Sequence, residues 1–244
     1  MKTIEFYSEV PGLAEIAPII PAKDYTAKWM LAARQEYIDM LKSSQLNSTH
    51  IYQCPGIFDL FNQGWIVPMW HDVLIKTENN KNSFAYMYPS DNIVNSLSGR
   101  EPVSRHADEL AKFIPKRPWS LNPVIKFNTP WHIIAPKGVK FIVLPINYPD
   151  TFEFESATGI LDPGHSNEIN FQVFWNVLNA EYVLKAGTPM CHIIPLSDEK
   201  FKVVCRDMND SDKKWNEKYK FLRGFTFTTK RNIIKDMYHT HFRK

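Results

Sequence analysis

The sequence lacks long hydrophobic runs, and this limits where the protein works. No apolar run in the 244 residues reaches the roughly 18 residues that a membrane-spanning helix needs, so we expect no membrane partner. The opening stretch, MKTIEFYSEVPGLAEI, has no apolar core of the kind found in signal peptides. We therefore expect a soluble protein that is not secreted by a signal peptide.

Cysteine and glycine are also scarce. The three cysteines, Cys54, Cys191 and Cys205, are odd in number, and no pair has C-x-x-C spacing. We interpret them as reduced thiols in a reducing compartment, each most simply a small buried residue. Nine glycines stand against seventeen prolines, and aromatic residues make up 14% of the chain. This composition suits short strands with stiff connections better than a helical bundle.

The second half of the chain has the pattern of an all-β domain. Eight short apolar runs follow one another from about residue 124, separated by turn signals such as NTP, PKG, DPGHSN and AGTP. Many short strands at such spacing are typical of a β-sandwich or barrel. The runs are VIKF, WHIIA, FIVLPINY, FEFESATGIL, INFQVFWN, EYVLKA, MCHIIPL and FKVVCR.

The first half mixes helices and strands. Helical spacing of apolar residues predicts a helix over about residues 25–43, capped by Asp24 or Thr26. A shorter helix at 54–64 is expected to start after Pro55 and to stop at Gly64. HDVLIKTE and FAYMY predict a strand and its return strand, and RHADELAKFI at 105–114 is helix-prone. We therefore expect helices to precede the β domain.

The end of the chain carries a concentrated positive charge. Residues 213–244 hold ten Lys or Arg and two acidic residues, a net charge of +8, so the remaining chain carries −5. The pattern predicts a helix, a short strand in FTFTT and a second helix in KRNIIKDMY. Seven aromatic residues among the cations are the parts of a single-stranded nucleic-acid groove, but they also fit docking onto the body or onto a neighbouring copy.

We divide the chain into an N-terminal extension with one helix (1–50), a β-barrel domain (51–210) and a basic aromatic tail (211–244).

Two segments resemble the dUTPase/dCTP-deaminase (β-clip) superfamily. Residues 157–176, ATGILDPGHSNEINFQVFWN, resemble its third motif, and VLKAGTPMCHIIPL at 183–196 resembles the next piece of that fold. The resemblance extends over about residues 124–200. It implies a mainly β fold, a dUTPase-like or jelly-roll barrel, with sites between the subunits of a trimer. We therefore expect a homo-oligomer, with a trimer favoured.

The resemblance assigns roles to residues around the DPGH turn. Asp162 matches the carboxylate that orients the attacking water in dUTPases, and His165 matches the aromatic residue that stacks on the deoxyribose. Glu168 matches the residue that closes the turn. If the chain is an enzyme, Asp162 and Glu168 are thus the expected catalytic residues, with Mg²⁺ holding the phosphates.

Other parts of that family's machinery are missing. No Arg-Ser-Ser phosphate-binding segment is present, and Lys137 is the one cation near its expected place. Gln172 stands where deaminases have a general-base Glu, and the Gly-rich lid is matched only by RGFTFTT, which begins at Arg223. Lys137, Arg223 and His165 are therefore the nucleotide-binding candidates. The absence of these catalytic and phosphate-binding segments favours a protein that kept the barrel but is not catalytic and needs no cofactor.

A second resemblance spans most of the chain. The Pro-rich segment ending at Trp29, Gly64-Trp65, KFNTPW with APKG after it, GILD and GTP resemble an uncharacterised family of tailed-phage and bacterial proteins. Our first hypothesis is a phage-encoded, non-catalytic β-barrel that acts by oligomerisation or binding, as a virion component or a host-protein binder. It would work in the host cytoplasm or the virion. The alternatives are a Mg²⁺-dependent dUTP- or dCTP-type pyrophosphatase and nucleic-acid binding through the tail.

Several histidines are candidates for metal ligands. His106 and Asp108 have the H-x-D spacing of a 2-His-1-carboxylate iron site, with His165 or His192 as the third ligand of a metal-dependent oxygenase. However, they lie in a helix-prone stretch, where residues i and i+2 do not share a face. A surface position fits them better, and His192, inside the apolar run MCHIIPL, fits a core histidine better than a ligand.

Overall fold

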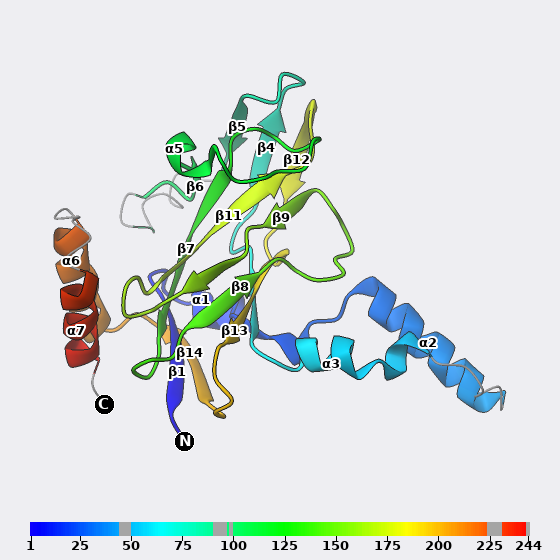
Figure 1. The fold of residues 1–244 in the computed structure, drawn as a ribbon, viewed down its shortest axis with the longest axis horizontal. Helices are drawn as coiled ribbons and strands as arrows, with labels where there is room; N and C mark the ends of the chain where they lie inside the picture. The colour runs from blue at the N-terminus through cyan, green and yellow to red at the C-terminus, as the bar shows by residue number, and fades with distance from the viewer. Residues whose placement is uncertain (44–49, 90–96, 98–99, 224–230, 243–244) are drawn as a thin grey trace.

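A computed structural model describes residues 1–43, 50–89, 97, 100–223 and 231–242 of the chain, and strands dominate it. Its fourteen strands form three sheets (Figure 1), which confirms the expected mainly β fold. The helices are α1 (Leu13–Ile16), η1 (Ala22–Asp24), α2 (Lys28–Lys42), η2 (Ile51–Gln53), α3 (Pro55–Phe61), α5 (Asp108–Ala111), α6 (Asp210–Arg223) and α7 (Arg231–His241). The strands are β1 (Thr3–Ser8), β2 (Ile20–Pro21), β3 (Trp65–Pro68), β4 (Val73–Thr77), β5 (Phe84–Met87), β6 (Val103–Arg105), β7 (Ile125–Ile134), β8 (Phe141–Leu144), β9 (Phe154–Ser156), β10 (Gly159–Leu161), β11 (Glu168–Trp175), β12 (Ala180–Leu184), β13 (Pro189–Pro195) and β14 (Lys202–Asp207).

The sheets combine strands from distant parts of the sequence. The largest sheet has the order β14-β1-β7-β11-β9, with β6 also paired to β7, and β1 runs parallel to β14. The second sheet has the order β10-β8-β13-β3-β2, and the third has the order β12-β4-β5. In the part of the chain that the structure describes, each sheet is open at its edges.

One hydrophobic core lies between the first two sheets. Phe6 of β1 meets Trp65 of β3 with ring centroids 5.4 Å apart, and Trp65 also contacts Phe141 of β8. Every second residue of β11 from Ile169 to Trp175 is buried, as expected of a strand with one face on the core. The alternating pattern in the sequence is therefore what places this strand.

Some elements differ from the sequence expectation. The stretch 105–114, expected to be helical, gives Arg105 to β6, and only Asp108–Ala111 of it forms the helix α5. The NTP signal predicts a turn, but β7 runs through it without interruption. Pro130 is tolerated there because it lies where the pairing of β7 with β11 shifts register, so the ladder does not need its missing N–H. The run FEFESATGIL forms two strands, β9 in the largest sheet and β10 in the second, instead of one.

Residues 1–50 do not form a single extension. β1 lies inside the largest sheet, between β14 and β7. By contrast, α2 projects away from the sheets beside α3 (Figure 1, right), and we call these two helices the arm. Met30 and Ala27 at the start of the arm pack around Phe61 of α3. Both helices were expected, α2 from its periodicity and α3 from Pro55 and Gly64, and both are confirmed.

The basic tail folds into a helical pair, α6 and α7, beside the largest sheet (Figure 1, left), which we call the hairpin. Trp215, Tyr219 and Tyr238 are buried in it, and the Tyr238 hydroxyl donates a hydrogen bond to the Ile133 carbonyl of β7 at 3.2 Å. The two predicted helices are confirmed, and the predicted strand FTFTT lies outside the described residues. None of the helices described is long and apolar enough to cross a membrane.

Candidate functional site

The DPGH turn, residues 162–165, connects β10 of the second sheet to β11 of the largest sheet. The Asp162 backbone carbonyl accepts hydrogen bonds from the amides of His165 (2.8 Å) and Ser166 (3.0 Å). Its side-chain Oδ1 accepts a third from the Gly164 amide (3.1 Å). The predicted turn is confirmed, and Asp162 uses one of its carboxylate oxygens to close it.

The other carboxylate oxygen of Asp162 faces the hairpin. Oδ2 lies 3.0 Å from Nζ of Lys235 on α7 and 4.0 Å from Nζ of Lys140. A Cβ added to Gly164 would stand 2.8 Å from Cγ of Lys235 and 3.1 Å from Nε2 of His239, so α7 sits directly on the turn. Asp162 is thus an ion-pair partner of this helix, and its side chain is only 16% exposed.

The other residues that the resemblance singles out have different surroundings. The His165 carbonyl accepts a hydrogen bond from the Tyr219 hydroxyl (3.2 Å), and the buried Glu168 carboxylate lies 3.3 Å from Nη1 of Arg100. Lys137 follows β7 and lines a groove beside α7. Arg223 ends α6, and its side chain is outside the described part of the chain. The cations that meet Asp162 are lysines to which the sequence assigned no role.

A buried polar network that no local sequence pattern reveals joins α6 to the sheet. Oε1 of Glu9 lies 3.0 Å from Nε2 of His132 and 3.1 Å from Nδ2 of Asn216, and its Oε2 lies 2.9 Å from Nη2 of Arg100. Burial raises the pKa of Glu9, but the hydrogen bonds and charges of His132 and Arg100 outweigh it and lower that pKa to about 2. Because Glu9 and Asn216 are 207 residues apart, only the fold brings them together.

A second charged cluster holds the same helix. Arg206 of β14 pairs with Glu5 at 2.9 Å and with Asp212 of α6 at 2.5 Å, and its guanidinium lies 5.4 Å from the centre of the Tyr7 ring. The Tyr7 hydroxyl donates to Asn216 at 2.9 Å. Charge-assisted hydrogen bonds as well as aromatic packing therefore hold the hairpin on the sheet.

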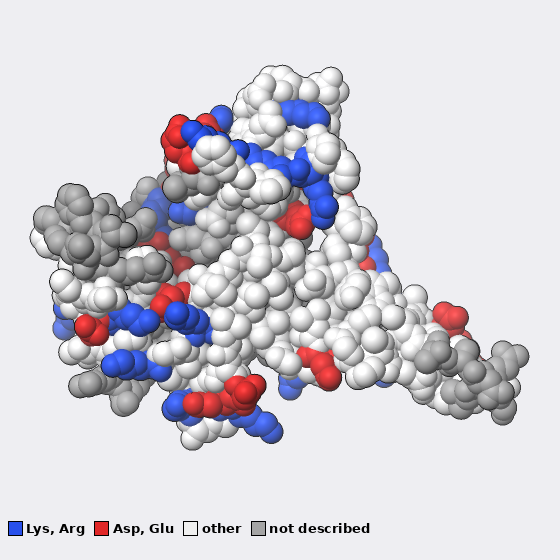
Figure 2. Space-filling model, in the orientation of Figure 1, with Lys and Arg blue, Asp and Glu red and all other residues white. Residues whose placement is uncertain are grey.

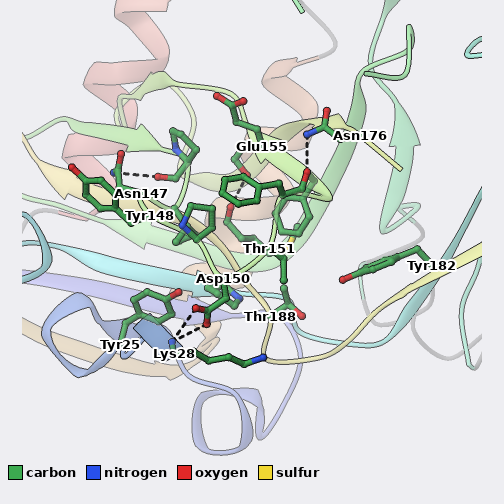
Figure 3. A pocket seen from close by; sticks show the side chains of 18 of the residues that line it. Tyr25, Lys28, Asn147, Tyr148, Asp150, Thr151, Glu155, Asn176, Tyr182 and Thr188 are labelled. Carbon is green, nitrogen blue, oxygen red and sulfur yellow. Dashed lines mark hydrogen bonds between the residues drawn. The ribbon is translucent and has the colours of Figure 1, made fainter. Parts of the chain in front are cut away.

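A cavity of about 610 Å³ lies at the base of the arm, a volume in the range of small-ligand sites (Figure 3). The loop between β8 and β9, residues 145–153, forms one wall, and the residues that lead into α2 form another. We call it the arm-base pocket. Residues that line it include Tyr25, Lys28, Arg117, Tyr148, Phe152, Asn176 and Tyr182.

Two contacts fix this loop to the arm. Ala27 occupies the N-cap of α2 and offers no capping side chain, so the two residues expected to cap this helix do not do so. Asp150 from the loop takes that role, with its carboxylate oxygens 2.9 and 3.0 Å from the Lys28 amide. Nε1 of Trp29 also donates to the Tyr148 carbonyl at 2.8 Å. These contacts hold the loop against the start of α2 and so fix one side of the pocket.

The lining of the arm-base pocket suits binding. Tyr148 and Phe152 on the loop are 55% and 76% exposed, so they stand at its rim. Burial, and then the negative charge of Asp150, raises the pKa of Tyr25, so its phenol stays protonated and can donate a hydrogen bond at neutral pH. Two cations and two carboxylates balance each other in the lining; they are Lys28, Arg117, Asp150 and Glu155. The arrangement offers stacking surfaces and hydrogen bonds.

Residues considered for metal binding serve other roles. The Asp108 carboxylate accepts two hydrogen bonds from Arg105, at 2.9 and 2.8 Å. Nε2 of His192 lies 2.6 Å from the Gln63 carbonyl, and its ring stacks on Phe61, which confirms the expected core histidine. Among the residues that the structure describes, no group of three or more His, Cys, Asp or Glu side chains is arranged to hold a metal ion.

The three cysteines are free thiols, as expected. Cys191 is fully buried, and burial raises the pKa of its thiol well above the usual value, so it is not poised as a nucleophile. Cys54 and Cys205 are half-buried.

Comparison with known proteins adds no further assignment, since neither a family model nor a curated protein sequence matches the chain.

Proposed function

We propose that this chain is a phage-encoded, non-catalytic binding protein with a dUTPase-like β-clip barrel that assembles into a homo-oligomer. Two sheets that share one core, and a DPGH turn that crosses from one sheet to the other, support the barrel. The resemblance to tailed-phage proteins supports the origin, and the host cytoplasm or the virion is then the place of action. A virion component or a binder of a host protein fits this description.

The position of Asp162 carries the non-catalytic part of the proposal. Hydrolysis by the resembling motif requires this carboxylate to orient a water molecule. Here Oδ1 closes the turn and Oδ2 pairs with Lys235 beneath α7, so both oxygens already have partners. Lifting α7 would also break the buried contacts of Tyr238. A structural use of Asp162 accounts for all of these contacts.

A nucleotide-turnover assay tests this part. The purified full-length protein is incubated with dUTP and dCTP in the presence of Mg²⁺, and pyrophosphate and ammonia are measured. We expect no release above buffer for the wild type, for Asp162→Asn or for Lys235→Met, which removes the ion pair and leaves the carboxylate. Release by the wild type that disappears in Asp162→Asn would establish the alternative, a divergent Mg²⁺-dependent nucleoside triphosphate pyrophosphatase.

The arm supports the assembly part of the proposal. Apolar side chains on it face solvent: Leu31 and Leu41 of α2 are 55% and 44% exposed, and Ile51 of η2, which precedes α3, is 45% exposed. Near its base, Tyr148 and Phe152 add exposed aromatic surface. Aromatic and apolar side chains of this kind are enriched at protein interfaces. We propose that the arm of one copy contacts the pocket region of the next, a head-to-tail contact of the kind that forms a ring when the rotation between copies closes.

Light scattering after size exclusion tests the assembly. We expect a trimer, a mass of about three times 28.5 kDa. Leu31→Glu combined with Leu41→Glu should yield monomers, because the change places charges in the proposed contact. Ala32→Glu with Ser43→Glu adds the same two charges at exposed positions of the arm and should leave the trimer intact. A monomeric wild type, or equal disruption by both pairs, would contradict an arm-mediated oligomer.

A further inference from the structure

A groove of about 860 Å³ runs between α7 and the adjoining ends of β1 and β14. It lies apart from the arm-base pocket and shares no lining residue with it. Its floor comes from the sheet and its side from α7. The polar residues that line it include Lys2, Lys137, Lys202, Thr3, His239 and Thr240.

Positively charged side chains outnumber negatively charged ones in the lining of this groove. Lys137 and Lys202 are exposed, and neither has a carboxylate within ion-pair distance among the described residues. Lys2 pairs with Glu199 at 2.8 Å on the exposed rim. Of the two carboxylates in the lining, Glu5 is buried and already bonded to Arg206 at 2.9 Å. The other, Asp236, is exposed, so a ligand would meet the cations Lys137 and Lys202 and this one carboxylate.

Further lysines lie next to the groove and add to its positive charge. Lys235 and Lys140 both lie within 4.0 Å of the single carboxylate of Asp162. His239, on the wall of the groove, has its pKa lowered first by burial and then by the positive charges of Lys235 and Lys137, although Asp162 and Asp236 oppose this. The positive charges of Lys235 and Lys137 around this histidine favour anions in the groove.

The groove continues across α7. A second hollow of about 400 Å³ on that helix shares Asp236 and Thr240 with the first and is also lined by Lys218 of α6 and His241. In Figure 2 the part of the surface that the hairpin occupies carries Lys and Arg side chains together with some Asp and Glu side chains. Phe242 lines the first groove, so an aromatic ring lies beside the cations. We call the two hollows together the α7 track.

We propose that the α7 track binds the phosphodiester backbone of a single-stranded nucleic acid. Its cations are spread along two adjoining hollows and do not converge on one point, which matches a chain of phosphates better than one triphosphate. Lysines follow a phosphate backbone without reading its sequence, and hydroxyl groups such as those of Thr3 and Thr240 add hydrogen bonds to phosphate oxygens. An aromatic side chain beside the cations is the usual partner of unstacked bases.

Fluorescence anisotropy with a labelled 20-nucleotide oligo-dT tests the proposal, using the full-length protein at several salt concentrations. We expect binding that weakens steeply with salt. Lys137→Glu with Lys202→Glu should weaken it at least tenfold and flatten the salt dependence. Lys23→Glu with Lys42→Glu, exposed lysines outside the track, changes the net charge equally and should alter affinity less than threefold.

Three results would overturn the assignment. They are the absence of binding by the wild type at low salt, an equal loss in both double variants, and displacement of the oligonucleotide by inorganic pyrophosphate at equal phosphate concentration. The last would mean that isolated phosphates suffice. If the charge-reversed variant does not fold, Lys137→Gln with Lys202→Gln replaces it, and unchanged affinity in that variant would equally contradict the proposal.

Discussion

The two ends of the chain both carry helices outside the sheets, but these helices are attached in opposite ways. In the C-terminal hairpin, Trp215 and Tyr238 are 1% and 0% exposed, and buried charges bond α6 to the sheet. The arm, in contrast, packs Met30 near Phe61 and otherwise leaves much of its apolar surface in solvent. Asp150 and one carbonyl hold it at its base.

Because of this difference, we expect the two ends to have different roles in the protein. The hairpin extends the folded body and covers the DPGH turn, so the residues of it that face the sheet and the turn stabilise the structure. The arm contributes little to the body's core, and its exposed apolar residues are free to meet another molecule. Removing contacts should therefore damage stability at the C-terminal end and association at the arm.

Replacing a tryptophan at each end gives the largest contrast. Trp215→Ala empties a fully buried site and removes a hydrogen bond to Asn167, so we expect a loss of about 3–5 kcal/mol in the free energy of unfolding. Trp29→Ala, at a half-buried site of the arm, removes one hydrogen bond and should cost about 1 kcal/mol. Urea denaturation measures both. Equal losses would remove the distinction between the two ends.

Acid should weaken the hairpin through Glu9. Its folded-state pKa of about 2 lies below the usual 4.5, so its stabilising contribution is complete above pH 4.5 and is lost as the pH falls toward 2. The loss over this window is on the order of 3 kcal/mol. Amide hydrogen exchange of α6 as a function of pH follows it. Glu9→Gln lacks the charge at every pH and should show a smaller acid dependence; parallel curves for both proteins would contradict this role.

The contact between the hairpin and the DPGH turn gives a smaller effect. Gly164→Ala places a Cβ 2.8 Å from Cγ of Lys235, so the Lys235 side chain or α7 itself has to shift, at a cost of about 1–2 kcal/mol. At Gly159, in the neighbouring strand, an added Cβ has no atom within 4 Å. Gly159→Ala is therefore the control, and thermal denaturation compares the two. A Gly164→Ala protein as stable as the control would mean that α7 does not rest on the turn.

The smallest effect is expected at the base of the arm. Asp150→Ala removes the cap of α2 and should cost about 1 kcal/mol. The loss should appear as faster amide exchange in the first turn of α2, with the hairpin unaffected. Asp59→Ala, an exposed carboxylate of α3, serves as control. Faster exchange in the hairpin as well would show that the two ends are coupled.

Local patterns allowed much of this fold to be predicted. Alternation along β11 and helical spacing in α6 and α7 place those elements because each has one face on an apolar surface, and the spacing in α2 places that helix although only Met30 and Ala33 of it are buried. The turn at Asp162 followed from its residue types. By contrast, Pro130 predicts a turn and lies within β7, because the register shift that accommodates it depends on β11.

The roles of the charged residues were beyond local reasoning. Glu9 finds its partners His132 and Asn216 at sequence distances of 123 and 207 residues. The sequence likewise gives no sign that Lys235 would reach Asp162. A motif indicates which side chain a turn presents, but the element that packs against the turn decides what that side chain does.

A double-mutant cycle between Asp162 and Lys235 tests most directly whether Asp162 serves the structure. The free energies of unfolding of the wild type, Asp162→Asn, Lys235→Met and the double variant are measured by urea denaturation at neutral pH. We predict a stabilising coupling energy of at least about 0.5 kcal/mol between the two side chains. A coupling energy of zero would mean that the carboxylate is not tied to α7, and would contradict the account.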